Sequence, residues 1–342
     1  MIPAIRIHQH GSVDVLRIDT VPEPTPQAHE VKIKTHASAL THMDLWVRRG
    51  IPGLPQLPLT LGCDLSGTVG AIGCDVTKFK IGDRVILFPL FSCGLCPACL
   101  RGAENLCPQF KIPGEHRDGT HTAFFCAPES QILKLDDRIS FEVGASFPLT
   151  FITAWHMLVK NGGVQAGMDV LVMAAGSGVG SAAVQIAKHF GARVIATASA
   201  EHRDKVFALG ADLVIDHYQE KIATRVKEFT KKKGVDLIIE HVGEKVWDEC
   251  LKALAWGGAL VTCGATTGPH VALDLRHIFI KQQKIIGSTM GTKAELVQIH
   301  ELIATGKLKP QIAKVFSYQD VTAAHTYLEN AHPFGKVMLD WN

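Results

Sequence analysis

The sequence of 342 residues predicts a two-domain α/β protein, in which a β-rich domain is combined with a doubly wound parallel sheet. Residues 1–149 contain many short apolar or alternating segments bounded by Gly, Pro or Asp, which is typical of strands joined by turns. From 150 to 287, apolar segments alternate with helical ones, as in a parallel sheet covered on both faces. Residues 288–342 are predicted to return to the first domain.

The strands that we expect in the first domain are short and separated by turn-forming residues. They are VLRIDTV (15–21), EVKIKTHA (30–37), LSGTVGAIG (65–73), DRVILFP (83–89), TAFFCAP (122–128) and SQILKL (130–135). This part of the chain therefore predicts a β-rich domain that closes on itself.

The second domain is predicted to contain six parallel strands, which is the number in a complete dinucleotide-binding sheet. The strands are DVLVMA (169–174), ARVIAT (192–197), DLVIDH (212–217), VDLIIEH (235–241), GALVTCG (258–264) and KIIGS (284–288). Helices are expected at SAAVQIAKHF (181–190), DKVFALG (204–210) and EKVWDECLKALAW (244–256). The last segment is expected to hold one helix, ELVQIHELIATG (295–306), and one strand, KVMLDW (336–341).

The charge balance makes nucleic acid and anionic membranes poor candidate partners. Lys and Arg number 35 against 33 Asp and Glu, and no basic run stands out. The polar N-terminus lacks the apolar core of a signal peptide, so a cytoplasmic location is expected. The most apolar stretch, 170–187, is interrupted by three glycines, which predicts a strand, a turn and a helix and no membrane span.

Four of the nine cysteines form a cluster in the sequence, namely Cys93, Cys96, Cys99 and Cys107. An odd number of cysteines without a secretory signal argues against a disulfide framework. The spacing C-x2-C-x2-C-x7-C suits tetrahedral coordination of Zn²⁺ by four thiolates, which leaves no position for water or substrate. We therefore predict a structural zinc site. An iron–sulfur cluster and four unrelated thiols are the alternatives.

A glycine-rich turn follows the first strand of the second domain and opens a helix. Gly176, Ser177, Gly178, Val179 and Gly180 form this turn. Such a turn lets the backbone approach a pyrophosphate, whose charge lies against the unpaired N–H groups of the helix N-terminus. The strict G-x-G-x-x-G spacing is not met, and glycines that only form a tight turn are the alternative.

The end of the second predicted strand bears on the choice of coenzyme. NAD-specific folds place a carboxylate there for the ribose hydroxyls, but this strand ends at Thr197. Ser199, His202 and Arg203 follow, and a hydroxyl and a guanidinium suit a 2′-phosphate. The pattern favours NADP(H) over NAD(H). Glu201 weighs against this preference, and Arg203 as a solvated residue is the alternative.

These features together resemble the medium-chain dehydrogenase/reductase superfamily, which contains zinc-type alcohol dehydrogenases and zinc-free quinone reductases. The resemblance rests on the cysteine cluster, GDRVI (82–86), the AAGSGVG turn (174–180) and FGKVML (334–339), and it covers essentially the whole chain. It implies a GroES-like catalytic domain at 1–149 and 288–342 with a structural zinc lobe at about 92–108. It also implies a Rossmann domain at 150–287.

Two further expectations come from the resemblance alone. The active site would lie in the cleft between the two domains. The chain would form a homo-oligomer, a dimer or a tetramer, through the edge strand KIIGS.

The sequence departs from the alcohol dehydrogenases at the three positions that bind their catalytic zinc. The stretches THMD, GCD and PLTFITAW match the family motifs, and the ligand positions hold Thr41, Cys63 and Thr150. A neutral hydroxyl is a poor zinc ligand, so we expect the catalytic zinc to be absent. Cys63 and Asp64 could still serve if His42 were recruited. A small buried thiol is the alternative role of Cys63.

The resemblance also suggests residues that contact the coenzyme. His42 and Lys336 match positions that face its phosphates, with an ordinary histidine and a solvated lysine as alternatives. Thr153 and Ser288 match positions beside the nicotinamide, although Thr153 could instead cap a helix. Met43 replaces the hydroxyl residue of the family's proton relay.

The predicted activity is hydride transfer from NADPH to a small molecule, either a double bond conjugated to a carbonyl or a quinone. Such acceptors delocalise negative charge to a remote oxygen, where hydrogen-bond donors suffice without a Lewis acid. Thr41, His42 and His116 are the candidate donors, and an exposed loop position is the alternative for His116.

Two other functions stay open. One is a zinc-dependent alcohol dehydrogenase that uses Cys63, Asp64 and His42 as ligands. The other is a non-catalytic NADPH-binding protein. The substrate cannot be derived from the sequence, because pocket residues come from loops and the fold hosts many substrates.

Overall fold

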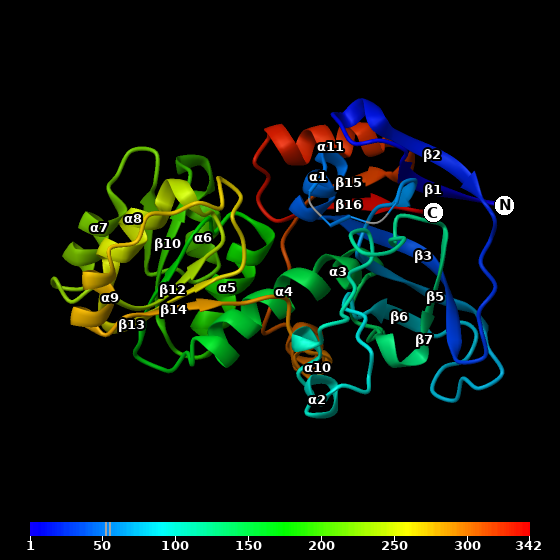
Figure 1. Cartoon of the computed structure of the whole chain (residues 1–342), viewed down its shortest axis with the longest axis horizontal. Coiled ribbons are helices and arrows are strands. Elements are labelled where there is room, and N and C mark those ends of the chain that lie inside the picture. The colour runs from blue at the N-terminus through cyan, green and yellow to red at the C-terminus, as the bar shows by residue number, and fades with distance from the viewer. Residues whose placement is uncertain (52, 55) are drawn as a thin grey trace. The chain divides into compact units, whose positions relative to one another are not determined.

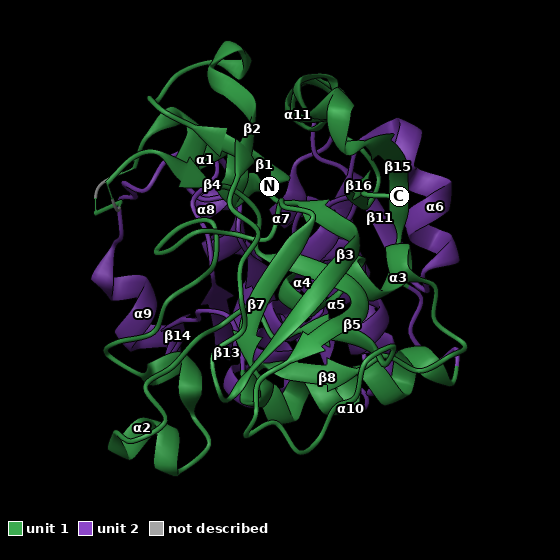
Figure 2. Cartoon of the chain, turned by 90° about the vertical axis from the view of Figure 1, so that its right-hand side faces the viewer, with its two compact units in different colours: residues 1–149, 292–305, 310–342 green, residues 150–291, 306–309 purple. Residues whose placement is uncertain are grey.

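The computed structural model describes residues 1–51, 53–54 and 56–342. By its internal contacts the chain divides into two compact units, which are coloured separately in Figure 2. The first unit comprises residues 1–149, 292–305 and 310–342, and the second comprises 150–291 and 306–309. The assignment of catalysis to one unit and dinucleotide binding to the other stays a prediction, because compactness alone does not reveal function.

The first unit is built on two β-sheets (Figure 1). A three-stranded sheet has the order β2-β1-β4, and a larger sheet has the order β15-β16-β3-β5-β6-β8, with β7 paired to β3. The strands are β1 (Ile2–Ile7), β2 (Leu16–Val21), β3 (Glu30–Leu40), β4 (Leu59–Thr60), β5 (Asp64–Ile72), β6 (Arg84–Leu87), β7 (Phe124–Pro128), β8 (Ile132–Lys134), β15 (Ile312–Ser317) and β16 (Lys336–Asp340).

Strand β3 organises the larger sheet, because it pairs with β5, β7 and β16. Its alternating apolar residues, such as Val31 and Ile33, are fully buried in a core with Leu65, Val85 and Phe125. The alternation of apolar and polar side chains that predicts a strand thus corresponds to one buried face.

Short helices join and cover these strands. They are α1 (His42–Arg49), α2 (Pro97–Leu100), α3 (Phe141–Ser146), α10 (Lys293–Ala304) and α11 (Val321–Asn330), with 3₁₀ turns η1 (Val13–Val15), η2 (Glu104–Leu106), η3 (Glu129–Gln131) and η6 (Tyr318–Asp320). Helix α4 (Pro148–Trp155) begins in the first unit and continues in the second.

The second unit contains a six-stranded parallel sheet with the order β11-β10-β9-β12-β13-β14 (Figure 1). In chain order this is 3-2-1-4-5-6, the order of the Rossmann fold, so the predicted fold class is confirmed. The strands are β9 (Asp169–Val172), β10 (Arg193–Ala198), β11 (Leu213–Asp216), β12 (Val235–Glu240), β13 (Leu254–Thr262) and β14 (Lys284–Gly287).

Helices cover the sheet of the second unit and bury its apolar strands. They are α5 (Gly178–His189), α6 (Arg203–Ala208), α7 (Ile222–Phe229), α8 (Glu244–Ala253) and α9 (Leu275–Lys281), with the π-helical η4 (His156–Asn161) and the 3₁₀ turn η5 (Ala200–His202). Within the described residues, no helix has both the length and the apolar character needed to cross a membrane.

One predicted helix boundary was wrong, and two elements of the C-terminal segment were missed. The helix expected over 244–256 ends at Ala253, and Leu254 already belongs to β13, where it pairs in register with Val235 of β12. Pairing with the neighbouring strand here overrides a local pattern that suits a helix. The C-terminal segment also contains more than the one helix and one strand expected, because α11 and β15 lie between them.

Candidate functional site

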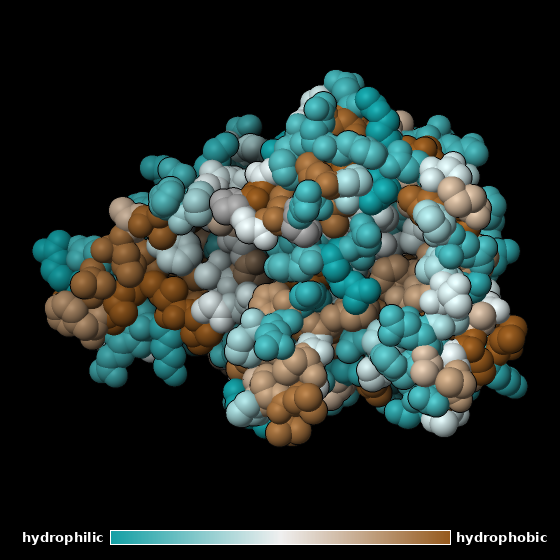
Figure 3. Space-filling view, turned by 45° about the vertical axis from the view of Figure 1, so that its right-hand side comes forward, coloured by the Kyte–Doolittle hydropathy of each residue, from teal (hydrophilic) through white to brown (hydrophobic). Residues whose placement is uncertain are grey.

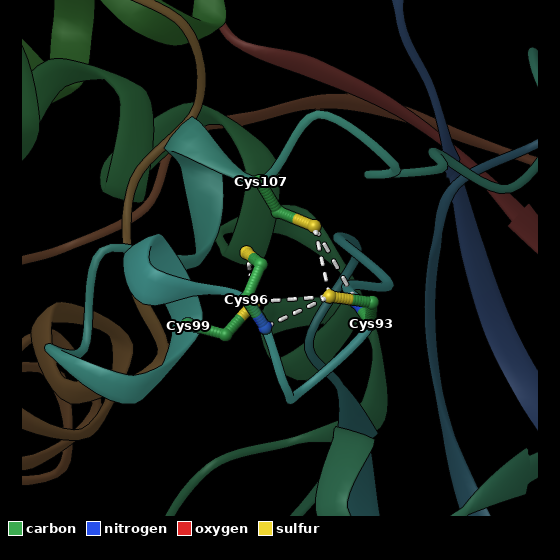
Figure 4. A group of neighbouring side chains, drawn as sticks. All are labelled: Cys93, Cys96, Cys99 and Cys107. Atoms are coloured by element: carbon green, nitrogen blue, oxygen red, sulfur yellow. Dashed lines mark hydrogen bonds between the residues drawn. The ribbon is translucent and has the colours of Figure 1, made fainter.

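The four clustered cysteines come together in the lobe that contains α2 and η2 (Figure 4). Their sulfur atoms all lie within 4.8 Å of one another. The Cys93 sulfur is 3.9 Å from that of Cys99 and 3.6 Å from that of Cys107, and Cys96 and Cys99 are 3.6 Å apart. A disulfide requires about 2.05 Å, whereas a zinc tetrahedron with bonds of about 2.3 Å has edges of about 3.8 Å.

Backbone groups of the lobe are oriented toward the sulfur atoms. The Cys96 N–H donates to the Cys93 sulfur at 3.4 Å, and the Cys93 N–H donates to the Cys107 sulfur at 3.5 Å. Hydrogen bonds from the Leu95 and Cys96 backbone lower the pKa of Cys93 to about 6. Donors that stabilise thiolates are what a Zn²⁺ ligand set requires, so the residues present fit a structural zinc ion.

The first unit also brings together several residues predicted from the alcohol dehydrogenase motifs. Thr41 caps the N-terminus of α1, and its backbone N–H and hydroxyl donate to Asp44 Oδ2 at 2.7 and 3.0 Å. The other Asp44 oxygen accepts the Gly62 N–H at 2.9 Å. Asp44 is fully buried, so one carboxylate connects the start of α1 with the turn before Cys63.

Only glycine fits at position 62. Its φ of +91° lies in the left-handed region, and an added Cβ would come within 2.5 Å of the His121 ring. His121 is fully buried, and the Thr120 N–H donates to the Gly62 carbonyl at 2.9 Å. The loop at 119–121 therefore packs tightly against the turn that carries Cys63 and Asp64.

Cys63 is fully buried, and burial, together with the carboxylates of Asp64 and Asp44, raises the pKa of its thiol well above the usual value. Burial therefore disfavours the thiolate form of this side chain. A neutral thiol is a weak nucleophile and a weak metal ligand.

Asp64 and Lys336 form a buried ion pair, with 3.6 Å between Asp64 Oδ2 and Lys336 Nζ. Asp64 Oδ1 accepts the Leu149 N–H at 3.0 Å. Neither Oδ2 nor Nζ has a hydrogen-bond partner among the described residues. Burial, opposed by Lys336, raises the pKa of Asp64 to about 6. Buried polar atoms without partners are rare in proteins, and here they leave donor and acceptor capacity for a bound group.

The two predicted histidines of the first unit differ in their surroundings. His42 lies at the start of α1, where its side chain retains exposed surface. Partial removal of its ring from water by neighbouring protein atoms, together with the positive charge of Lys336, lowers its pKa. His116 accepts the Ile112 N–H at its Nδ1 atom, and its ring lies edge-on to Phe110.

The glycine-rich turn of the second unit has the geometry expected of a phosphate cradle. Ser177 caps α5, and its hydroxyl accepts the Gly180 N–H at 3.0 Å. A Cβ on Gly180 would come within 2.2 Å of the Ala174 carbonyl oxygen, so a side chain there is excluded. The remaining N–H groups of the first turn of α5, including those of Gly178 and Val179, have no helical acceptor and face the N-terminal end. Gly176 precedes the cap.

His241 was missed by the sequence reading as a site residue. It directly follows β12, and its Nε2 atom lies 3.1 Å from the Ser177 hydroxyl. The sequence contains a signal that could have identified His241, because ligands of parallel sheets bind at the carboxyl ends of the strands. The VDLIIEH segment places a polar residue at that end of β12.

The residues predicted to select the coenzyme follow β10, which ends at Ala198. The Thr197 hydroxyl is used internally, since it accepts the Ala174 N–H at 2.9 Å. The Ser199 hydroxyl donates to Glu201 at 3.3 Å, and the same carboxylate lies 3.6 Å from His202. The Arg203 guanidinium lies over the Phe207 ring, 5.8 Å from its centroid.

The remaining predicted residues lie in α4 and after β14. Thr150 and Thr153 are buried in α4, which belongs to the second unit from Thr150 onward. The Ser288 N–H donates to the Thr262 carbonyl, and its hydroxyl has no hydrogen-bond partner among the described residues. An unpaired hydroxyl at the carboxyl end of a parallel strand is available to a ligand.

Comparison with known proteins places this geometry in a family. Residues 27–137 match the model of the alcohol dehydrogenase GroES-like domain, and residues 178–305 match that of the zinc-binding dehydrogenases. Acryloyl-coenzyme A reductase of Sulfurisphaera tokodaii is 30% identical over 325 residues, which cover 94% of this chain and 96% of the relative. The chain belongs to the medium-chain dehydrogenase/reductase superfamily.

Two further relatives of this superfamily extend the comparison. Human quinone oxidoreductase is 28% identical over 349 residues, covering 99% of this chain and 98% of the relative. A crystal structure of an NAD-dependent alcohol dehydrogenase superposes with a TM-score of 0.96 at 42% identity, covering 99% and 100% of the two chains. The chain is an NAD(P)-dependent oxidoreductase of the medium-chain superfamily, and it combines a GroES-like domain with a Rossmann-type sheet.

Proposed function

We propose that the chain reduces a carbonyl-conjugated double bond or a quinone with NADPH, without a catalytic zinc ion. The observation that carries the proposal is the chemistry at two ligand positions of the first unit. The Thr41 hydroxyl donates to Asp44, and burial raises the pKa of Cys63 and disfavours its thiolate form. Neither group competes with a thiolate, an imidazole or a carboxylate for Zn²⁺.

The arrangement around Cys63 supports the same conclusion. Among the described residues, three or more side chains of ligand type come within 4.8 Å of one another only at the four cysteines of the lobe. Asp64, which could complete an alternative site with Cys63 and His42, instead faces the Lys336 ammonium. The positive charge of Lys336 disfavours a second cation beside Asp64.

Acceptors of the proposed class suit such a site. The nicotinamide supplies the hydride, and the acceptor carries the resulting charge to an oxygen that hydrogen-bond donors stabilise. Two relatives are named for the reduction of acryloyl-coenzyme A and of quinones, which supports this substrate class. We propose His42, His116 and Thr41 of the first unit as candidate donors, and Thr150 of the second unit as a further candidate site residue.

The chain's own residues would bind and orient the coenzyme. In the second unit, the α5 N-terminus and the 176–180 turn would hold the pyrophosphate, and Thr153 and Ser288 would contact the nicotinamide side. In the first unit, we propose Lys336 and His42 as coenzyme-binding residues. Thr197 supports the turn through its bond to the Ala174 N–H. The unpaired Ser288 hydroxyl supports a ligand at that position.

We propose NADP(H) as the preferred coenzyme. No carboxylate stands at the end of β10, and the Arg203 guanidinium and the Ser199 hydroxyl follow it. The Glu201 carboxylate is engaged by Ser199 and His202, which lessens its repulsion of a 2′-phosphate. The similar structure named as an NAD-dependent enzyme makes NAD(H) the coenzyme to test against.

The test combines activity with metal analysis. NADPH and NADH consumption is measured against quinones, enones, enoyl thioesters and aldehydes, with zinc counted per chain. The proposal expects turnover of enones or quinones and one zinc ion per chain. Two zinc ions per chain with alcohol oxidation would support the second candidate, a zinc alcohol dehydrogenase that uses Cys63, Asp64 and His42, which the 42% identical structure favours. NADPH binding without turnover would favour a non-catalytic protein.

We also propose a homo-oligomer formed through β14. This strand lies at one edge of the six-stranded sheet, and apolar side chains gather on the surface that carries α9 (Figure 3). They include Trp256, Leu275, Phe279 and Ile280, each more than half exposed. An unpaired strand edge with apolar neighbours is suited to pairing with a second copy. Sedimentation of the wild type and of Ile285→Pro tests this, and a monomeric wild type would contradict it.

A further inference from the structure

Four buried side chains of the first unit form a row of polar contacts that the proposed function leaves unexplained. The Trp341 indole N–H donates to Ser38 Oγ at 2.8 Å, and Ser38 Oγ lies 2.9 Å from His121 Nδ1. At the other side of the ring, His121 Nε2 lies 3.8 Å from Asp44 Oδ1. Ser38, His121 and Asp44 are fully buried, and Trp341 is 8% exposed.

The row has a direction that follows from its donors and acceptors. The Trp341 indole can only donate, so Ser38 Oγ accepts there, and its own proton is free to be donated to His121 Nδ1, which is the direction that we assign in the proposal below. Burial lowers the pKa of His121 and so disfavours its charged form. With Nδ1 accepting, the ring proton lies on Nε2, which is 3.8 Å from Asp44 Oδ1, a charge–dipole contact, and has no hydrogen-bond partner among the described residues. The opposite tautomer would aim the Nε2 lone pair at a carboxylate oxygen.

The end of the row is the carboxylate that connects two parts of the predicted site. Asp44 accepts hydrogen bonds from Thr41 at the start of α1 and from the Gly62 N–H. Cys63 and Asp64 follow Gly62 directly. The position of Asp44 therefore sets the position of the turn relative to α1.

We propose that the row from Trp341 through Ser38 and His121 to Asp44 is a positioning device for the reaction site, with His121 and Trp341 as positioning residues. The catalytic meaning of this inference rests on the function proposed above. The structural part of the inference does not depend on that function, because it concerns only the tautomer of His121 and the rigidity of the turn at 62–64. Errors on the order of 1 Å in such a turn cost up to about a hundredfold in rate.

The Trp341 end of the row is held in place by the surrounding structure. Trp341 follows β16, which pairs with β3 so that Leu339 lies opposite Ser38 (Figure 1). The Trp341 ring stacks on Tyr318, with centroids 4.5 Å apart. The far end of the row is thus fixed by a sheet and by stacking, and site geometry is most precise when it is held by rigid elements.

The test uses variants that remove one contact at a time. Trp341→Phe removes the indole N–H and keeps an aromatic ring, Ser38→Ala removes the hydroxyl, and His121→Gln offers an acceptor and a donor in place of the imidazole. Trp247→Phe is the matched control, because its buried indole N–H has no partner among the described residues.

The first readout is the tautomer of His121 in protein with ¹⁵N-labelled histidine. The resonance that disappears in His121→Gln identifies the residue. We expect the Nε2–H tautomer in the wild type and in Trp247→Phe, and a shifted tautomer balance in Trp341→Phe and Ser38→Ala. An Nδ1–H tautomer or a charged ring in the wild type would overturn the inference.

The second readout is the alkylation rate of Cys63, followed by mass spectrometry of its peptide. Cys250 of the second unit is equally buried and serves as the internal control. We expect Trp341→Phe and Ser38→Ala to accelerate Cys63 by roughly tenfold while Cys250 changes less than roughly twofold. Equal acceleration of both thiols would mean general destabilisation and would overturn the inference.

The third readout is steady-state kinetics with NADPH and the best acceptor. We expect kcat to fall by on the order of tenfold in Trp341→Phe, with KM for NADPH changed less than roughly twofold, and to recover partly in His121→Gln relative to His121→Phe. Unchanged kcat in all variants would overturn the positioning role. If the wild type turns over no acceptor, the proposed function fails, while the tautomer and alkylation results still decide this inference.

Discussion

The Lys336 ammonium lies 3.6 Å from the Asp64 carboxylate, and both side chains are buried. Burial raises the pKa of Asp64 to about 6, above its ordinary value of 3.8. Between these two values the folded chain holds a proton that the unfolded chain has released. The free energy of unfolding from this group therefore falls as the pH rises from about 4 to 6, because the native state binds more protons there.

We predict that this pH dependence is absent in Asp64→Asn. Between pH 4.5 and 7 the wild type should lose about 2 kcal/mol of stability relative to that variant, measured by urea unfolding. Asp137→Asn, whose carboxylate is 97% exposed, is the control and should follow the wild type. The same pH dependence in Asp64→Asn and wild type would contradict the prediction.

The cysteine lobe predicts the effect of removing one ligand. Cys96→Ser should lower the zinc content from one ion per chain to near zero and lower the unfolding temperature, because a structural ion contributes its binding energy to folding. Zinc is measured by mass spectrometry of the metal. Cys74→Ser replaces an exposed cysteine outside the lobe and should keep the ion. Full zinc content in Cys96→Ser would show that the lobe does not hold it.

The neighbourhood of β10 predicts a shift in coenzyme preference. Glu201→Gln removes a negative charge beside Ser199 and His202. NADPH should then bind roughly fivefold more tightly, the effect of about 1 kcal/mol, while NADH changes little. Quenching of intrinsic fluorescence gives both dissociation constants. The control Glu228→Gln changes an exposed carboxylate on α7, and equal effects of the two variants would argue against a 2′-phosphate at this position.

The contact between His241 and Ser177 predicts a role in coenzyme binding. His241→Leu removes a hydrogen-bond partner of the residue that caps α5, so dinucleotide affinity should fall by roughly fivefold, the effect of about 1 kcal/mol. His189→Leu, at the C-terminal end of the same helix, provides the control and should bind as the wild type does. Isothermal titration calorimetry measures both. No loss of affinity in His241→Leu would leave the contact a purely structural one.

Two adjacent arginines of α1 predict very different stability losses. Arg48 is 1% exposed and bonds to Gly11, His325 and Glu329, whereas Arg49 is half exposed and contacts only Glu329 among these groups. Arg48→Met should cost about 3 kcal/mol, and Arg49→Met less than about 1 kcal/mol. Urea unfolding measures the stability of both variants. Equal losses of stability in Arg48→Met and Arg49→Met would mean that burial does not strengthen the Arg48 contacts.

Local patterns predicted most of the second unit. Six apolar segments correspond to β9 through β14. Strands buried on both faces, such as β9, β10 and β12, require continuous apolar residues, whereas the edge strand β14 is largely exposed. The prediction failed at 254–256, where helical periodicity continues but pairing with β12 draws the chain into β13. In the C-terminal segment, α11 and β15 were missed because apolar residues are sparse in both, and in β15 they are also partly exposed.

The candidate site was predictable only in part. The motif stretches singled out Thr41, Cys63 and Asp64 as candidate site residues, because they match known family motifs. His121 and Trp341 gave no such signal, since nothing in GTHT or LDWN indicates that their side chains meet the same buried row.

The sequence by itself determined the fold class, the four-thiolate lobe and the glycine turn, because periodicity and short spacings act within a few turns of the chain. Only the tertiary structure decided the pairing of Lys336 with Asp64 and the row from Trp341 to Asp44. Trp341 and Ser38 are 303 positions apart, and sheet pairing of β16 with β3 brings them together. Burial then raises the pKa of Cys63 and of Asp64, and burial arises only when distant segments pack.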